Sequence, residues 1–376
     1  MSLATPTKTL PPAKTAVAPA SPGRPRTRLL ALDGLRLVAA LMVCLYHYTG
    51  RGGVVSASWH QNPAHVFPTL SRAAVYGCLG VEFFFVISGF VICMSSWGRS
   101  LGDFFRSRVA RLYPAYWVAL VLITGASLVL PAVVHAVRFD EFLVNLTMLQ
   151  QPMGAPRVLG VCWTLWVEVR FYALFALLVV LPGVTYRRVV LFCSVWTLAA
   201  VLSTSAGGPW TELVVMPQYA PYFIGGLALY LVHRFGGGVL PWGIVALSWI
   251  LGLRMATEGL WHAGSPRNPY VVMLVVTLAY AAVAAVAAGW TRWAAWPWLT
   301  TAGALTYPFY LVHEHLGWFV IRVLHRGWGL PPWPTLAVTV PAMLGLAWLI
   351  HRYVERPFGL RLKTALKGDA RTRRPV

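Results

Sequence analysis

Residues 80–94 read GVEFFFVISGFVICM, and Glu82 is the single charged residue among them. The apolar run continues on both sides to cover 75–96, which is long enough for a helix that crosses the hydrocarbon core of a bilayer. The sequence therefore predicts an all-α, polytopic integral membrane protein, a bundle of about ten transmembrane helices. The nine other predicted spans are 30–48, 112–131, 166–183, 188–204, 213–232, 239–256, 270–289, 299–321 and 335–353.

The composition of the whole chain favours a membrane protein over a soluble one. Of its 376 residues, 58% are hydrophobic and 11% are charged, which lies outside the usual balance of soluble domains. The net charge of +20 is spread over short segments between apolar runs, and no soluble basic domain holds it. We therefore expect the lipid bilayer as a partner and no nucleic acid.

The distribution of Lys and Arg predicts the orientation in the membrane. With both termini cytoplasmic, the inner loops and the two tails hold 21 of the 31 Lys and Arg residues, and the outer loops hold eight. Cytoplasmic loops of membrane proteins are enriched in these residues. We therefore expect a disordered, basic, Pro- and Ala-rich cytoplasmic arm at 1–28, a transmembrane domain at 29–358 and a basic cytoplasmic tail at 359–376.

The first span, LDGLRLVAALMVCLYHY at 32–48, contains Asp33, Arg36 and His47 among apolar residues. A charge near the bilayer centre costs on the order of 3 kcal/mol, so such residues generally face a polar interior. The step from Arg36 to His47 returns nearly to the same helix face and rises by roughly 16 Å. Arg36 is therefore expected near the cytoplasmic surface and His47 deeper. Asp33 fits either a pair with Arg36 or a helix N-cap.

Basic residues gather just before the third span, in DFFRSRVARLYPAYW at 103–117. Arg106, Arg108 and Arg111 fit two interpretations. They are either topology charges at the cytoplasmic face, or a cradle for a polyanionic ligand such as the phosphates of coenzyme A.

The fourth span begins with WTLWVEVRFYALF at 163–175, in which Glu168 and Tyr172 lie one helical turn apart and Arg170 stands between them. An ionisable residue inside a span is a functional candidate by default. For Glu168, a structural ion pair and a direct catalytic role are equally open.

Six segments in order resemble acyltransferase family 3, a family of bacterial multipass membrane enzymes. They are LDGLRLVAALMVCLYHY, GVEFFFVISGFVI, FFRSRVARLYPAYW, WTLWVEVRFYALF, LTYPFYLVHE and VERP. The resemblance covers 29–358 and implies a multipass protein of the cell membrane. It implies transfer of an acyl group, often acetyl, from cytoplasmic acyl-CoA to a hydroxyl of a sugar, a cell-wall polymer or a small natural product. Thr164 stands where the family often has Ser, and Arg170 is an unusual charge beside Glu168.

The resemblance also implies roles for residues of this chain. Arg36 and His47 match the family's essential pair, and acyl-CoA is a co-substrate, with no permanently bound cofactor and no metal. His47 would take the proton from the acceptor hydroxyl, helped by Asp33 or Glu168, and an acyl-histidine intermediate is a variant. Arg36 would guide the thioester inward. The phosphates of acyl-CoA would be held by Arg106, Arg108 or Arg111.

The acceptor side is assigned to residues of the fourth and ninth spans. The candidates for lining it are Tyr172 of the fourth span and Tyr307, Tyr310, His313 and Glu314 of the ninth. Aromatic packing with an interfacial His–Glu pair is an equally good interpretation for the ninth span. The acceptor itself stays open among a macrolide or its sugar, a surface polysaccharide, and a glycolipid or peptidoglycan precursor.

The competing class of function is a secondary transporter or a flippase. Many carriers also combine about ten spans with intramembrane carboxylates and interrupted helices. The ordered family segments and the lack of a visible inverted repeat favour the acyltransferase.

Overall fold

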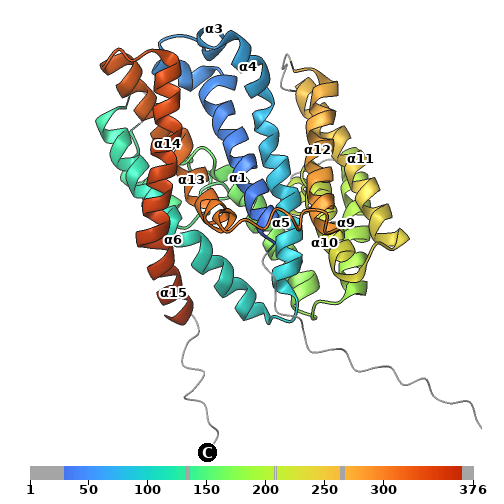
Figure 1. Ribbon diagram of the computed structural model, residues 1–376. Coiled ribbons are helices and arrows are strands. Elements are labelled where there is room, and N and C mark those ends of the chain that lie inside the picture. Colours follow the sequence, from blue (N-terminus) through green and yellow to red (C-terminus); the bar gives the residue numbers. More distant parts are fainter. Residues whose placement is uncertain (1–28, 132–135, 207, 209, 263–266, 366–376) are drawn as a thin grey trace, which may run out of the picture.

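The computed structural model describes residues 29–131, 136–206, 208, 210–262 and 267–365, which form a bundle of helices (Figure 1). The first half contains α1 (Leu30–Leu45), η1 (Tyr46–Gly50), η2 (Gly53–Val55), α2 (Ser56–Trp59), α3 (Pro63–Val66), α4 (Pro68–Ala74), η3 (Val75–Leu79), α5 (Gly80–Ser96), α6 (Leu101–Val129), α7 (Phe139–Asn145), α8 (Cys162–Phe175) and η4 (Ala176–Val180). The second half contains α9 (Tyr186–Ala206), η5 (Thr211–Val215), α10 (Ala220–Phe235), α11 (Val239–His262), α12 (Pro269–Ala287), α13 (Trp298–Ile321), η6 (Arg322–Gly327), α14 (Pro332–Ile350), η7 (His351–Glu355) and α15 (Arg356–Ala365).

Eight helices in the described part of the chain are long and apolar enough to cross a membrane. The predicted helical, polytopic membrane protein is therefore confirmed. The sixth and ninth predicted spans correspond to α10 and α13, which are not among the eight. The 16-residue α10 is buried along its length from Ala220 to Val232, and α13 contains His313 and Glu314, which are also buried. Protein, rather than lipid, surrounds these two helices.

The helix of the third predicted span, α6, starts earlier in the chain than the sequence predicted. We expected an inner loop at 97–111, but α6 begins at Leu101 and includes the basic segment. The Ser100 hydroxyl accepts a hydrogen bond from the Asp103 backbone nitrogen at 3.1 Å and donates one to the Asp103 carboxylate at 2.9 Å. This N-cap satisfies a free amide of the first turn and extends the helix beyond the apolar run.

The sixth predicted span, 213–232, is not one continuous helix. A short π-helical turn ends at Val215, Met216 has a φ of +51°, and α10 begins at Ala220. Pro217 and Pro221 cannot donate backbone hydrogen bonds, so a helix that ran through Met216 and Pro217 would lose part of its ladder.

The packing order places α13 between α1 and α14, as Figure 1 shows. The short helices α3 and α4 lie at one end of the bundle, called the α3 end below, and α15 lies at the opposite end, called the α15 end. The positive-inside rule predicts that the α15 end is cytoplasmic.

Two glycines allow α5 and α10 to pack closely. A Cβ on Gly89 would lie 2.2 Å from the Phe223 carbonyl oxygen, and a Cβ on Gly226 would lie 2.0 Å from the Val86 carbonyl oxygen. Small residues at helix contacts permit this approach in membranes. We expect Gly226→Ala to force the helices apart and to destabilise the protein by about 2 kcal/mol.

The measurement is the apparent midpoint of thermal unfolding in detergent, followed by tryptophan fluorescence. Gly243→Ala on α11 is the matched control, because a Cβ there meets no atom within 4 Å. A Gly226→Ala protein as stable as this control would contradict the close contact between α5 and α10.

Candidate active site

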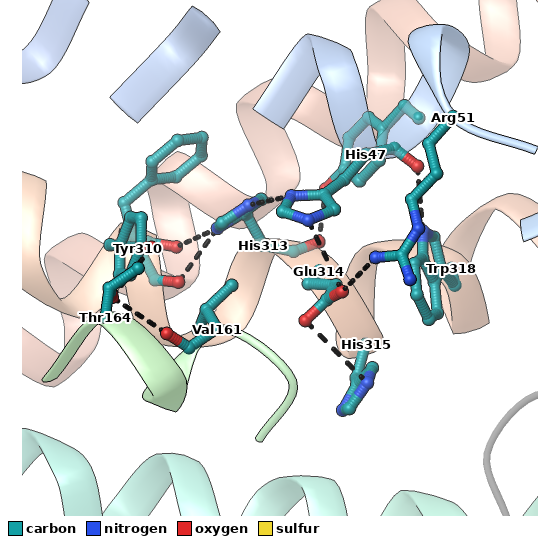
Figure 2. Close-up of polar contacts among 11 residues, drawn as sticks. His47, Arg51, Val161, Thr164, Tyr310, His313, Glu314, His315 and Trp318 are labelled. Atoms are coloured by element: carbon teal, nitrogen blue, oxygen red, sulfur yellow. Dashed lines mark hydrogen bonds and ion pairs between the residues drawn. The ribbon is translucent and has the colours of Figure 1, made fainter. Parts of the chain in front are cut away.

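His47 lies toward the α3 end, where α1 passes into the π-helical turn of residues 46–50. Its backbone carbonyl accepts a hydrogen bond from Trp318 Nε1 at 3.1 Å. The neighbouring Tyr48 hydroxyl donates to the His313 carbonyl at 2.7 Å. These two bonds fasten the end of α1 to α13, and the His47 ring is buried beside His313 (Figure 2).

A chain of hydrogen bonds sets the tautomer of the His47 ring. His313 Nδ1 lies 2.9 Å from the carbonyl oxygen of Tyr310 and 3.2 Å from that of Phe309. Because carbonyl oxygens only accept, this Nδ1 carries a hydrogen, and the Nε2 of a neutral His313 is then an acceptor. His47 Nδ1 lies 3.0 Å from that Nε2 and donates to it. When both rings are neutral, His47 Nε2 is therefore the nitrogen of this ring without a hydrogen.

Glu314 stands beside this nitrogen. Its Oε1 lies 3.4 Å from His47 Nε2 and 3.3 Å from Arg51 Nη1. Its Oε2 lies 3.8 Å from His315 Nε2 and has no hydrogen-bond partner in the described protein. A Cβ on Gly160 would lie 2.2 Å from that Oε2, so the glycine provides the room for the carboxylate. The result is a buried carboxylate between two histidines and an arginine.

These groups face a cavity of about 560 Å³ at the α3 end. Besides His47, Glu314 and Arg51, its lining includes Arg157 and Trp163. The segment before α8 is held by Asn145, whose side chain bonds the Pro156 carbonyl at 2.9 Å and the Val158 nitrogen at 3.1 Å. We call this space the outer cavity. Its wall contains the imidazole of His47, the guanidinium groups of Arg51 and Arg157, and the indole of Trp163.

Arg36 faces a second cavity, of about 300 Å³, toward the α15 end. Asp33, Arg111, Tyr307 and Glu355 also line it. Asp33 is not the helix N-cap that we considered, because Leu29 holds that position and Asp33 lies in the first turn of α1. We call this second cavity the inner cavity; with Arg356, its wall contains three arginines and two carboxylates.

A narrow space of about 50 Å³ lies on the other side of Arg36, deeper in the bundle. Its walls include Glu168, Tyr307 and Tyr310. Thr164 also lines it, and the Thr164 hydroxyl lies 3.0 Å from the Tyr310 hydroxyl. This space shares Arg36 and Tyr307 with the inner cavity, and the carbonyl of Tyr310 bonds the His313 ring that contacts His47.

None of these three cavities is lined by Arg106, Arg108 or Tyr172, which the sequence marked as site residues. Arg106 is paired with Asp103 (Nη2 to Oδ1, 2.9 Å), and Arg108 Nη2 donates to the Ser95 hydroxyl at 3.3 Å. The ring of Tyr172 contacts Phe104, with centroids 6.4 Å apart, and Tyr172 is not in the lining of the outer cavity. Arg111 therefore lines the same cavity as Arg36, whereas Arg106 does not.

Tyr307 also lies away from the outer cavity. It lines the inner cavity and the narrow space, and its hydroxyl donates to the Leu112 carbonyl at 3.0 Å. Arg170 does not approach Glu168: its Nη1 donates to the carbonyl oxygens of Glu212 at 2.8 Å and Leu213 at 3.3 Å. Glu168 is therefore left to face Arg36.

Sequence reasoning missed several residues of the outer cavity. Arg51 follows His47 by one helical turn, and Trp318 follows Glu314 by the same step. Each therefore lies on the same helix face as a residue that the sequence had marked as a candidate. Arg157 and Gly160 belong to a connection without a periodic pattern, and nothing in the sequence pointed to them.

Comparison with known proteins places this site in context. The family model of the acyltransferase domain matches residues 29–352. Acyltransferase MdmB of Streptomyces mycarofaciens is 27% identical over 370 residues, spanning 88% of this chain and 91% of its own length. Nodulation protein 10 of Rhizobium leguminosarum bv. viciae is 26% identical over 370 residues, spanning 89% and 94%.

A more distant likeness covers part of the chain. Peptidoglycan O-acetyltransferase OatA of Listeria monocytogenes is 26% identical over 161 residues, which span 38% of this chain and 22% of that protein. No solved structure matches the chain significantly.

Proposed function

Because the chain belongs to the acyltransferase family whose domain model matches residues 29–352, we propose that it moves a short acyl group from acyl-CoA to a hydroxyl of a glycan or a small natural product. The observation that carries this proposal is the position of His47, which lines a cavity of about 560 Å³ while its Nδ1 lies 3.0 Å from His313 Nε2. The name of the relative OatA, an O-acetyltransferase, supports a hydroxyl as the acceptor.

The acceptor binds in the outer cavity with its hydroxyl at His47 Nε2. As the acceptor oxygen attacks the thioester carbonyl, its proton passes to this nitrogen. The carbon–sulfur bond then breaks, and the leaving thiolate takes the proton from His47, which gives the acylated acceptor and free coenzyme A. Glu314 Oε1, at 3.4 Å, stabilises the positive charge that the ring carries between these steps.

The donor enters from the α15 end, through the inner cavity. Arg36 and Arg111 line that cavity together, and guanidinium groups bind phosphate oxygens with two parallel hydrogen bonds. Arg111 is exposed and suits the phosphates, whereas Arg36 is partly buried and suits the pantetheine or thioester end. Asp33 and Glu168 balance the charge of Arg36, so that this residue is stable inside the bundle.

The narrow space favours a short acyl group. Its volume of about 50 Å³ is far smaller than either neighbouring cavity, and a space of this size holds only a few atoms. The hydroxyls of Thr164 and Tyr310 meet there and are available to hydrogen-bond a thioester carbonyl. Acetyl-CoA is therefore the first donor to test.

The direct test is thiol release by the purified protein in nanodiscs. We expect release from acetyl-CoA to require a hydroxylated acceptor, supplied as pooled glycans and natural products, and to fall as the acyl chain lengthens. The acylated product should be detected by mass spectrometry. A stable protein that carries acceptors across the bilayer without consuming any thioester would instead establish a transporter.

Two arginine variants test the proposed donor site in the same assay. Arg111→Gln should raise the KM for acyl-CoA about tenfold, because one charge-assisted contact to phosphate contributes roughly 1.5 to 3 kcal/mol. Arg106→Gln should leave it nearly unchanged, since its guanidinium already pairs with Asp103. Equal effects of the two substitutions would contradict a donor site in the inner cavity.

A further inference from the structure

A further cavity of the described structure lies apart from the proposed reaction path. Its volume is about 1230 Å³, and it is enclosed by the start of α1, the ends of α5, α10 and α12, and the residues that follow α12. All these segments meet toward the α15 end, which is predicted to be cytoplasmic. We call it the basic cavity, because its wall contains Arg99, His233, Arg234 and Arg292.

The wall of the basic cavity has no carboxylate to balance these charges. Its described lining contains no Asp or Glu, and none of the ion pairs among the described residues involves Arg99, Arg234 or Arg292. Arg234 lies over the Trp97 ring, with its Cζ 4.6 Å from the centroid, and its Nη1 donates to the Tyr230 hydroxyl at 3.2 Å. Three guanidinium groups around one hollow favour an anionic ligand.

Much of the rest of the wall is apolar, which favours a ligand that carries more than a phosphate. Leu29, Leu30, Met94, Val232 and Val286 line the cavity beside the arginines. An amphiphile with an anionic head and an apolar body fits such a mixed wall, and basic pockets between transmembrane helices on the cytoplasmic side bind anionic lipid headgroups.

The connection between α12 and α13 places this cavity at the membrane interface. Residues 288–298 read AGWTRWAAWPW, and Thr291, Arg292, Ala294 and Ala295 of this segment line the cavity. The tryptophans that alternate with them point outward: the exposed fractions of Trp290, Trp293, Trp296 and Trp298 are 75%, 71%, 45% and 58%. Three exposed indoles in the connection, followed by a fourth at the first residue of α13, are typical of a segment that sits among lipid headgroups.

Gly289 helps to form this wall. It ends α12 with a φ of +78°, which a residue with a side chain rarely adopts. A Cβ there would lie 3.3 Å from Arg292 Nε, so the guanidinium rests against the glycine backbone beside the cavity.

We propose that the basic cavity binds the headgroup of an anionic phospholipid from the cytoplasmic leaflet. Arg99 and Arg292 hold the phosphate, Arg234 borders it from the Trp97 ring, and the apolar wall receives the glycerol and the upper acyl chains. The site is separate from the inner cavity, which contains Arg36 and Arg111, so lipid and acyl-CoA bind at the same time.

Native mass spectrometry of the delipidated protein tests the proposal, with dioleoyl-phosphatidylglycerol titrated against dioleoyl-phosphatidylcholine. We expect the wild type to retain phosphatidylglycerol selectively, and the double variant R99Q/R292Q to bind it at least about tenfold more weakly. The variant R99K/R292K keeps the charges and should recover part of the affinity. R187Q/R361Q is the matched control, because it removes two exposed arginines outside the cavity and should bind like the wild type.

Two results would overturn the proposal. One is a phosphatidylglycerol affinity of R99Q/R292Q equal to that of R187Q/R361Q, which would place lipid binding elsewhere. The other is displacement of the lipid by adenosine 3′,5′-bisphosphate with the same dependence on Arg99 and Arg292, which would assign the cavity to the nucleotide end of coenzyme A. Neither result depends on catalysis, so the proposed acyl transfer is tested separately.

Discussion

Replacing His47 with alanine will reduce kcat for acyl transfer by on the order of 10³-fold, because a positioned general base contributes about 10²- to 10⁴-fold. The hydrogen bond from Nδ1 to His313 leaves Nε2 of the neutral ring as an acceptor, and His47 lines the outer cavity. The measurement is thiol release from acetyl-CoA at saturating donor and acceptor.

His65→Ala is the matched control for this substitution. His65 is exposed in the short helix α3 and does not line the outer cavity, so its loss should leave the rate unchanged. Both variants should keep the elution profile of the wild type in detergent, since Trp318 still bonds the backbone at residue 47. Substantial transfer by His47→Ala would remove His47 from the reaction and contradict the proposed mechanism.

Much of the fold follows from the sequence, because a bilayer leaves a chain few choices. Apolar runs of sufficient length must form helices that satisfy their own backbone groups, and the predicted spans all correspond to helices. The helices differ from the predicted spans where a helix cap or a proline changes the local backbone. Ser100 extends α6 beyond its apolar run, and Met216 with Pro217 interrupts the sixth predicted span.

Helix periodicity also predicted one face of the site. Asp33, Arg36 and His47 all lie on the side of α1 that faces α13: Asp33 lies against Gly303, Arg36 shares a cavity with Tyr307, and His47 bonds His313. Periodicity further explains why Arg170 does not pair with Glu168. Two residues apart on a helix, Glu168 and Arg170 do not face each other, and only Glu168 of the two lines the narrow space beside Arg36.

The partner of His47 could not be predicted in the same way. His313 lies 266 residues further along the chain, and the spacing within one helix does not reveal which other helix it contacts. The sequence marked His313 as a candidate for the acceptor side, but not as the residue that orients the base. Arg157 and Gly160 reach the outer cavity through side-chain bonds of Asn145, which no periodic pattern records.

His313→Phe will lower kcat by on the order of 10²-fold while leaving the KM for acyl-CoA nearly unchanged. The His313 ring touches neither substrate in the proposed mechanism; it fixes the hydrogen on His47 Nδ1 and so keeps Nε2 free, and loss of such tautomer control is costly in catalytic triads. Phenylalanine retains the ring, which packs on Phe309 with centroids 5.6 Å apart. The bundle should therefore stay folded.

His313→Gln separates this positioning role from packing. A glutamine oxygen can accept the hydrogen bond from His47 Nδ1 although the ring is lost, so this variant should recover part of the rate that His313→Phe loses. If packing were the main role of His313, phenylalanine would be the better substitute and glutamine the worse. Because the two interpretations rank the variants in opposite order, kcat values for the pair, with thermal midpoints beside them, decide whether the hydrogen-bond chain from the Tyr310 carbonyl through His313 to His47 directs the base.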